Sequence, residues 1–264
     1  MILSAKRVFG RAGWSAAAAI SAAALVALAA VFTAPARAAD ATIAVAANFT
    51  EPARAIAAVF RAKTGRDVAL SFGASGAFYT QIRQGAPFDA MLSADGERPR
   101  KLADEGLGVA GSRFVYATGK LALWTRASGA APGEATLREG KFEKLAIANP
   151  LAAPYGAAAI EVMRALGVED ALRPKRVEGA SIGQAFQFAE TGNAEFAFVA
   201  LSQTIGKGGS LWLAPPNLHT PIRQEALLLK AGQSNETAKA FLDFLKGPEA
   251  RALIVKYGYD PSAN

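Results

Sequence analysis

One stretch, residues 68–95, constrains the fold more than any other part of the chain. It opens with VALSF, an apolar run typical of a buried strand, passes through the turn GASGA and enters the amphipathic segment AFYTQIRQG. This order predicts a strand, a tight turn and a helix. The first N–H groups of a helix lack partners inside it, and its dipole places about half a positive charge there. We therefore expect an anion to bind at this turn, with Ser75 at the N-cap position, although the turn alone also fits an ordinary serine cap.

The same order of apolar strand, small-residue loop and helix recurs along the chain. Further strands are predicted at ATIAVA, FDAMLSA, FVYAT, GKLALWTR, LAIA and EFAFVAL, each near a predicted helix. Such alternation predicts an α/β fold with a largely parallel sheet. We interpret the proline-rich segment GSLWLAPPNLHTPIRQEALLL as the chain returning from a second set of units to the first. We therefore expect two lobes with a hinge of two crossings, with residues 39–118 and 222–264 in lobe one and residues 119–221 in lobe two.

Residues 1–38 are not expected to fold with the rest. Three basic residues, Lys6, Arg7 and Arg11, precede the apolar run SAAAAISAAALVALAAVF, which leads to the tripeptide ARA. A basic region, an apolar region and an A-x-A site are the pattern of a secretory signal peptide, so we predict cleavage after Ala38 and a periplasmic protein. The alternative is an uncleaved membrane anchor, because the run is close to spanning length.

Composition argues against several classes of chemistry. The chain has no cysteine and one histidine, His219, which removes thiol chemistry and the usual metal-ligand clusters. It has no G-x-G-x-x-G and no Walker A lysine, and Ala77 stands where a nucleophile elbow requires glycine. Loss of residues 1–38 removes four basic residues and lowers the net charge from +7 to about +3, too little to suggest nucleic acid. We predict a protein without catalytic residues, cofactor or nucleic-acid partner.

Ligands of open α/β sheets bind outside the carboxyl ends of the strands. The residues at these places are Ala47, Asn48 and Phe49 after IAVA; Ala74, Ser75 and Gly76 after VALSF; Pro154, Tyr155 and Gly156 after LAIAN; and Ser181, Ile182 and Gly183 before QAFQFAE. They offer neutral donors and no charge. Several N–H and O–H donors can hold a dehydrated dianion, at about 1.5 to 3 kcal/mol per charge-assisted bond. The pattern favours a fully ionised tetrahedral anion. The alternatives are structural: a loop contact for Asn48, packing between lobes for Tyr155 and a plain helix start for Ile182.

Charged residues near these turns are assigned structural roles. Asp89 and Asp95 flank the strand AMLSA and would repel an anion, so we expect them to cap or tie down the backbone. We expect Arg83, Arg98 and Arg100 to be solvated.

Four stretches together resemble the periplasmic molybdate-binding proteins of ABC transporters: AANFTEPARAIAAVF, SFGASGAFYTQIRQGAPFDAMLSAD, NPLAAPYG and FLKGPEARALIVKYGY. The resemblance covers the whole mature chain. It implies a type II periplasmic binding protein fold, with two lobes, a hinge and an oxyanion held in the interlobe cleft by hydrogen bonds alone. Its first-lobe donors fall on Asn48 and Ser75, and its second-lobe donors on Tyr155 and the backbone N–H of Ile182. It implies a monomer that captures molybdate or tungstate for a membrane permease, with no metal other than that of the anion.

The chain departs from the family pattern at two positions. Asn48 stands where many members have a serine, and Ala200 where many have a tyrosine at the end of a strand. Tyr155 replaces a small residue, so its phenol is a candidate substitute for the missing tyrosine. Sulfate stays an alternative ligand because it is also unprotonated, whereas ferric ion is disfavoured because no second tyrosine or carboxylate accompanies Tyr155 in the motifs.

Overall fold

The computed structural model describes residues 39–261. The predicted signal peptide, residues 1–38, and its cleavage site after Ala38 lie outside the described residues. Among the helices of residues 39–261, none has the length and apolar character needed to cross a membrane.

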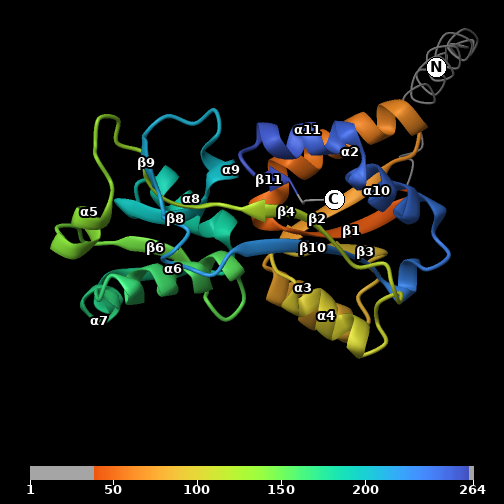
Figure 1. Ribbon diagram of the computed structural model, residues 1–264, viewed down its shortest axis with the longest axis horizontal. Coiled ribbons are helices and arrows are strands. Elements are labelled where there is room, and N and C mark those ends of the chain that lie inside the picture. The colour runs from red at the N-terminus through yellow and green to blue at the C-terminus, as the bar shows by residue number, and fades with distance from the viewer. Residues whose placement is uncertain (1–38, 262–264) are drawn as a thin grey trace, which may run out of the picture. The chain divides into compact units, whose positions relative to one another are not determined.

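The first of two sheets combines strands from both ends of the described chain (Figure 1). Its order is β11 (Asp260–Pro261), β4 (Phe114–Gly119), β10 (Ile222–Leu228), β3 (Ala90–Leu92), β1 (Ala41–Ala46) and β2 (Val68–Gly73). Strand β1 pairs in parallel with β2 and β3, whereas β10 runs antiparallel between β3 and β4. The parallel strands therefore end together at one edge of this sheet.

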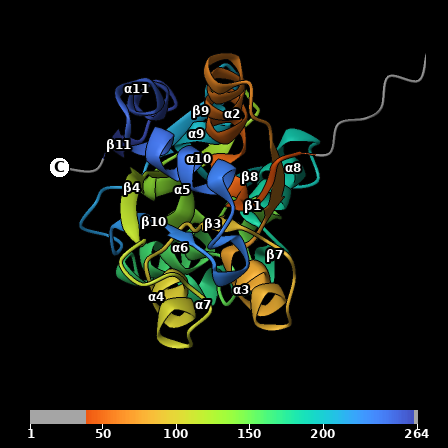
Figure 2. The same ribbon diagram turned by 90° about the vertical axis from the view of Figure 1, so that its right-hand side faces the viewer.

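Helices cover both faces of the first sheet. Figure 1 shows α2 (Thr50–Thr64), α10 (Glu236–Lys246) and α11 (Pro248–Lys256) above it, and α3 (Ser75–Arg83) and α4 (Glu97–Asp104) below it, an arrangement that Figure 2 repeats from the side. Helix α2 buries Ile56 and Phe60, which lie four residues apart on one face, and ends where Gly65 takes a φ of 69°. The predicted strands and helices of this region are confirmed.

The second sheet has the order β7 (Arg176–Gly179), β6 (Leu145–Ala148), β8 (Phe196–Ala200), β5 (Leu121–Thr125) and β9 (Ser210–Leu213). Its helices are α5 (Glu134–Glu139), α6 (Pro154–Ala165), α7 (Glu169–Leu172), α8 (Ile182–Glu190) and α9 (Leu201–Thr204). Short 3-10 helices, η1 (Ala47–Phe49), η2 (Arg173–Lys175) and η3 (Lys230–Gly232), complete the described chain. We call each sheet with its helices the first and the second lobe.

The chain passes between the sheets twice, from β4 to β5 and from β9 to β10. Strands of the first sheet lie within residues 41–119 and 222–261, and strands of the second within residues 121–213. Lobe limits at residues 118 and 222 stay a prediction.

Both sheets are mixed, which the expected alternation of strand and helix did not show. Strand β10 returns from the second sheet and inserts antiparallel between two strands of the first. In the second sheet, β5 is antiparallel to β8 and β9. Strands β7 and β9 and helix α5 were not predicted, because the runs that form them are short and mix polar with apolar residues.

Candidate functional site

The four residues singled out from the sequence line one small cavity between the lobes. Asn48 and Ser75 come from the first lobe, and Tyr155 and Ile182 from the second. Small residues complete the wall: Ala46, Ala47, Gly73, Ala74, Ala94, Ala153 and Pro154. The cavity is small, with a volume of about 10 Å³. The fold thus brings the four residues together, and their part in binding stays a prediction.

Four helices begin at this cavity. Helix η1 starts at Ala47, α3 at Ser75, α6 one residue before Tyr155, and α8 at Ile182. Within residues 39–261, the backbone N–H groups of Ser75, Tyr155 and Ile182 have no acceptor outside their own helices. First-turn N–H groups also lack partners within a helix. Unpaired donors and the positive ends of helix dipoles therefore converge on one point.

Ser75 does not cap its helix, so this sequence prediction is wrong. Ala74 is the N-cap residue, and Ser75 is the first residue of α3. The Ser75 Oγ instead accepts a hydrogen bond from the backbone N–H of Ala94, 3.0 Å away in the loop after β3. The hydroxyl proton stays available for donation, because accepting a bond through a lone pair does not use it.

The charge of the cavity wall is neutral. Of the residues that line it, Tyr155 alone carries an ionisable side chain, and burial raises its pKa well above the usual value of 10. No group of three or more histidine, cysteine, aspartate or glutamate residues suited to a metal ion occurs within residues 39–261. The geometry fits a desolvated anion that is held by N–H and O–H donors. The cavity wall has no charged side chain that could coordinate it.

The side-chain amide of Asn48 is already engaged by the protein. Its Nδ2 donates to Oε1 of Gln224 at 2.9 Å and to the hydroxyl of Tyr259 at 3.0 Å. Both partners lie more than 170 residues further along the chain, so sequence spacing offered no signal for them. The group of Asn48 that is left for a ligand is its backbone N–H, in the first turn of η1.

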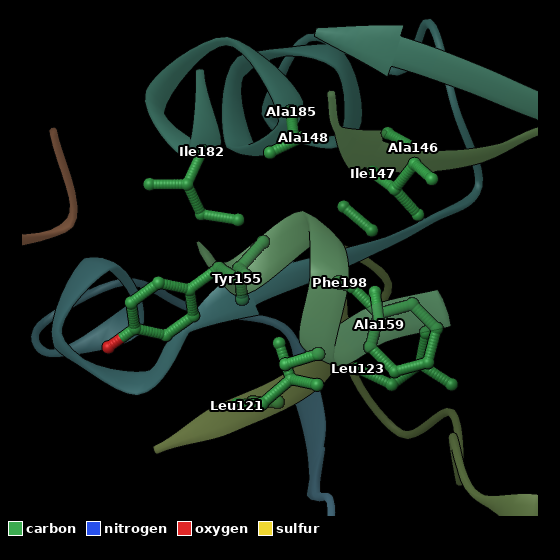
Figure 3. Packing of buried hydrophobic residues seen from close by; sticks show 14 of the residues in the cluster. Leu121, Leu123, Ala146, Ile147, Ala148, Tyr155, Ala159, Ile182, Ala185 and Phe198 are labelled. Atoms are coloured by element: carbon green, nitrogen blue, oxygen red, sulfur yellow. The ribbon is translucent and has the colours of Figure 1, made fainter. Parts of the chain in front are cut away.

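The phenol of Tyr155 is also paired. Its oxygen accepts a hydrogen bond from Nε2 of Gln224 at 3.2 Å, and its ring is buried between the lobes near Ile182 (Figure 3). Many family members have a tyrosine where this chain has Ala200. That the Tyr155 phenol takes the place of this tyrosine stays a prediction. Gln224 and Tyr259 are the residues that sequence reasoning missed.

Two hydrogen bonds join the lobes at the rim of the cavity. The backbone N–H of Gly76 donates to the carbonyl oxygen of Ala152 at 2.9 Å, and Nη2 of Arg98 donates to the carbonyl oxygen of Leu151 at 2.9 Å. Arg98 also pairs with Asp95, and its side chain is only 17% exposed. The prediction that Arg98 is solvated is therefore wrong, because the second lobe covers it.

The other charged residues behave as predicted. Asp89 accepts from the backbone N–H of Thr42 at 2.7 Å, and Asp95 from that of Arg98 at 3.1 Å. Arg83 and Arg100 are more than half exposed, beside Glu105 and Asp104.

Comparison with known proteins agrees with this arrangement. Residues 41–260 match the family described as bacterial extracellular solute-binding protein. The chain belongs to this family. It is 53% identical to the molybdate-binding protein ModA of Rhodobacter capsulatus, over 89% of this chain and 87% of that protein. It is 52% identical to ModA of Azotobacter vinelandii, over 94% of each.

Solved structures of other binding proteins share the fold. The periplasmic molybdate-binding protein of Azotobacter vinelandii superposes with a TM-score of 0.81 at 37% identity, covering 84% of this chain and all of that one. The sulfate-binding protein SubI of Mycobacterium tuberculosis superposes with a TM-score of 0.71, and its 15% identity shows the fold alone. The predicted membership of the molybdate-binding family and the two-lobed type II periplasmic binding protein fold are confirmed.

Proposed function

We propose that this chain is an extracytoplasmic solute-binding protein that captures molybdate, and tungstate equally, for delivery to an ABC transporter permease. The observation that carries the proposal is the convergence of helix N-termini from both lobes on a cavity without charged side chains. Its relatives at more than half identity are molybdate-binding proteins. Such a site binds a ligand and has no group placed for catalysis, so we propose no enzymatic activity.

The proposed donors are the hydroxyl of Ser75 and the backbone N–H groups of Asn48, Ser75, Tyr155 and Ile182. The Asn48 amide donates to Gln224 and Tyr259, and the Tyr155 hydroxyl accepts from Gln224 and is hydrogen-bonded to Tyr259, which supports a backbone role for both residues. Five charge-assisted bonds at about 1.5 to 3 kcal/mol each are enough for sub-micromolar binding after association costs are subtracted.

The burial of the cavity supports capture by lobe movement. Asn48, Ser75, Tyr155 and Ile182 are each at most 3% exposed, so an anion in solution cannot reach them while the lobes are closed. We propose that the lobes part slightly to admit the anion and close again around it, as hinged two-domain proteins do.

Sulfate is the second candidate, because it is also a fully ionised tetrahedral dianion. The fold alone is shared with a sulfate-binding protein, whereas the sequence groups with molybdate-binding proteins. We propose molybdate as the preferred ligand on that ground. The remaining parts of the proposal are export by residues 1–38 to the periplasm, a monomeric state and no nucleic-acid partner.

The test is calorimetric titration of refolded, ligand-free protein with molybdate, tungstate and sulfate. We expect similar tight binding of the first two and far weaker binding of sulfate. A molybdate concentration of about one hundred times Kd should raise the free energy of unfolding by about 2.7 kcal/mol. Tight binding of sulfate with none of molybdate or tungstate would reassign the ligand.

A further inference from the structure

A group of buried polar side chains connects the candidate site with the hinge. We call it the hinge network, and its members are Asn48, Tyr116, Tyr155, Ser202, Gln224 and Tyr259. Gln224 on β10 is at its centre and is 0% exposed. Its Oε1 accepts from Nδ2 of Asn48 and from the hydroxyl of Tyr116, each at 2.9 Å, and its Nε2 donates to Tyr155 at 3.2 Å.

Ser202, on α9 of the second lobe, binds the main chain of Asn48. Its Oγ donates to the carbonyl oxygen of Asn48 at 2.7 Å and lies 2.9 Å from the hydroxyl of Tyr259. Tyr259 donates to that same carbonyl at 2.7 Å. Asn48 is thus tied through its side chain and its carbonyl oxygen, which fixes the position of the η1 turn at the cavity.

Only part of the hinge network crosses between lobes. The bonds of Gln224 to Tyr155 and of Ser202 to Asn48 and Tyr259 join residues of different lobes. The bonds of Gln224 to Asn48 and Tyr116 lie within the first lobe. Parting of the lobes therefore breaks the bonds between the lobes and leaves the bonds within the first lobe intact.

The side chains of Gln224 and Tyr155 pack tightly against the main chain where it first crosses between the lobes, from β4 to β5. Gly119 is the last residue of β4, and a Cβ built there would collide with the Tyr155 hydroxyl and lie 2.6 Å from Nε2 of Gln224. The contact between the two side chains therefore depends on the main chain of the crossing itself.

We infer that Gln224 and Ser202 are positioning residues for anion capture. They hold the loop of Asn48 against the helix of Tyr155 when the lobes are closed, and they slow release of the anion without touching it. The inference rests on the proposed function for the identity of the ligand. The contacts themselves join protein atoms only. A neutral hydrogen bond lost from the closed state should speed dissociation about three- to tenfold.

The experiment compares Gln224→Met and Ser202→Ala with matched controls. Gln233→Met makes the same exchange at an exposed glutamine of the first lobe, just after η3. Ser112→Ala removes a hydroxyl that donates to Val109 at 2.7 Å and accepts from Leu228 at 3.2 Å, both within the first lobe. Molybdate association and dissociation rates are measured by stopped flow, and the radius of gyration of ligand-free protein by small-angle scattering.

We expect both hinge-network variants to release molybdate faster, with association rates near those of wild type, and both controls to behave as wild type. A purely structural role would lower the melting temperature and leave the dissociation rate unchanged. Unchanged dissociation in Ser202→Ala and Gln224→Met overturns the inference, and Ser202→Ala decides alone where Gln224→Met does not fold.

The scattering measurement separates this inference from the proposed function. If wild type does not bind molybdate, the proposed function fails and the ligand-free radius of gyration decides. A larger radius in the two variants than in the controls then supports the inference, and equal radii overturn it.

Discussion

The backbone N–H of Gly76, in α3, donates to the carbonyl oxygen of Ala152, which lies 2.9 Å away in the loop before α6. The two residues belong to different lobes, so main chain meets main chain across the rim of the candidate site. Such a contact exists only while the lobes are closed. A side chain added at Gly76 therefore tests directly whether binding requires the lobes to close.

Gly76→Ala should weaken anion binding without destabilising the ligand-free protein. An added Cβ would lie 3.0 Å from the Cα and carbonyl oxygen of Ala152 and 3.2 Å from Nε of Arg98. Crowding of this kind costs about 1 to 3 kcal/mol in the closed state, whereas alanine within a helix is favoured over glycine by up to about 1 kcal/mol. Calorimetry for affinity and thermal unfolding for stability measure both effects.

The control for Gly76 is Gly208→Ala. No heavy atom lies within 4 Å of a Cβ at Gly208, so affinity should equal that of wild type. Equal affinity in Gly76→Ala would show that the rim contact is not needed for the bound state.

Ser75→Ala should cost about 1 to 3 kcal/mol of molybdate binding, because it removes a charge-assisted O–H donor. It should also lower the melting temperature, since the backbone N–H of Ala94 loses its acceptor. Titration calorimetry beside Ser112→Ala, a serine remote from the cavity, measures the binding term. An affinity equal to that of the control would remove Ser75 from the donor set.

Tyr155→Phe separates the two roles open to this residue. If the hydroxyl only accepts from Gln224 at 3.2 Å, its loss should cost about 0.5 to 1.5 kcal/mol of binding, with the backbone N–H retained. This is the result that we expect from titration calorimetry. A loss near 3 kcal/mol would show that the phenol donates to the anion, as the sequence resemblance suggested.

Stability should fall in alkali because of the buried tyrosines. Burial raises the pKa of Tyr259 to about 12 and the pKa of Tyr116 and of Tyr155 well above 10. Unfolded tyrosine has a pKa of about 10, so the folded state keeps protons that the unfolded state releases. The contribution of Tyr259 is complete below about pH 10 and is lost as the pH rises through about 12, and Tyr116 and Tyr155 act in the same direction. Scanning calorimetry across this range should show a falling melting temperature.

Tyrosinate absorbance provides the complementary measurement. The chain has five tyrosines, and Tyr116, Tyr155 and Tyr259 should ionise only together with unfolding. Ionisation of all five while the protein stays folded would contradict the burial of these three side chains.

Much of the fold could be predicted because its determinants are local. The apolar runs IAVA, VALSF and LAIA, each followed by small residues and an amphipathic segment, became β1, β2 and β6 followed by helices. A strand end followed by a helix start also indicated which turns face the ligand edge of a sheet. Position thus selected the four turns, the family resemblance selected Asn48, Ser75, Tyr155 and Ile182 within them, and all four line one cavity.

Tertiary structure alone decided which atoms of those residues are available. The Asn48 amide and the Tyr155 hydroxyl are both engaged by Gln224 and Tyr259, and Ser75 supports Ala94 instead of capping α3. These partners come from distant parts of the chain and meet only when two sheets pack around a hinge. Local periodicity records which face of a segment is buried, but it carries no information about the donor or acceptor that a second lobe brings to a buried polar group.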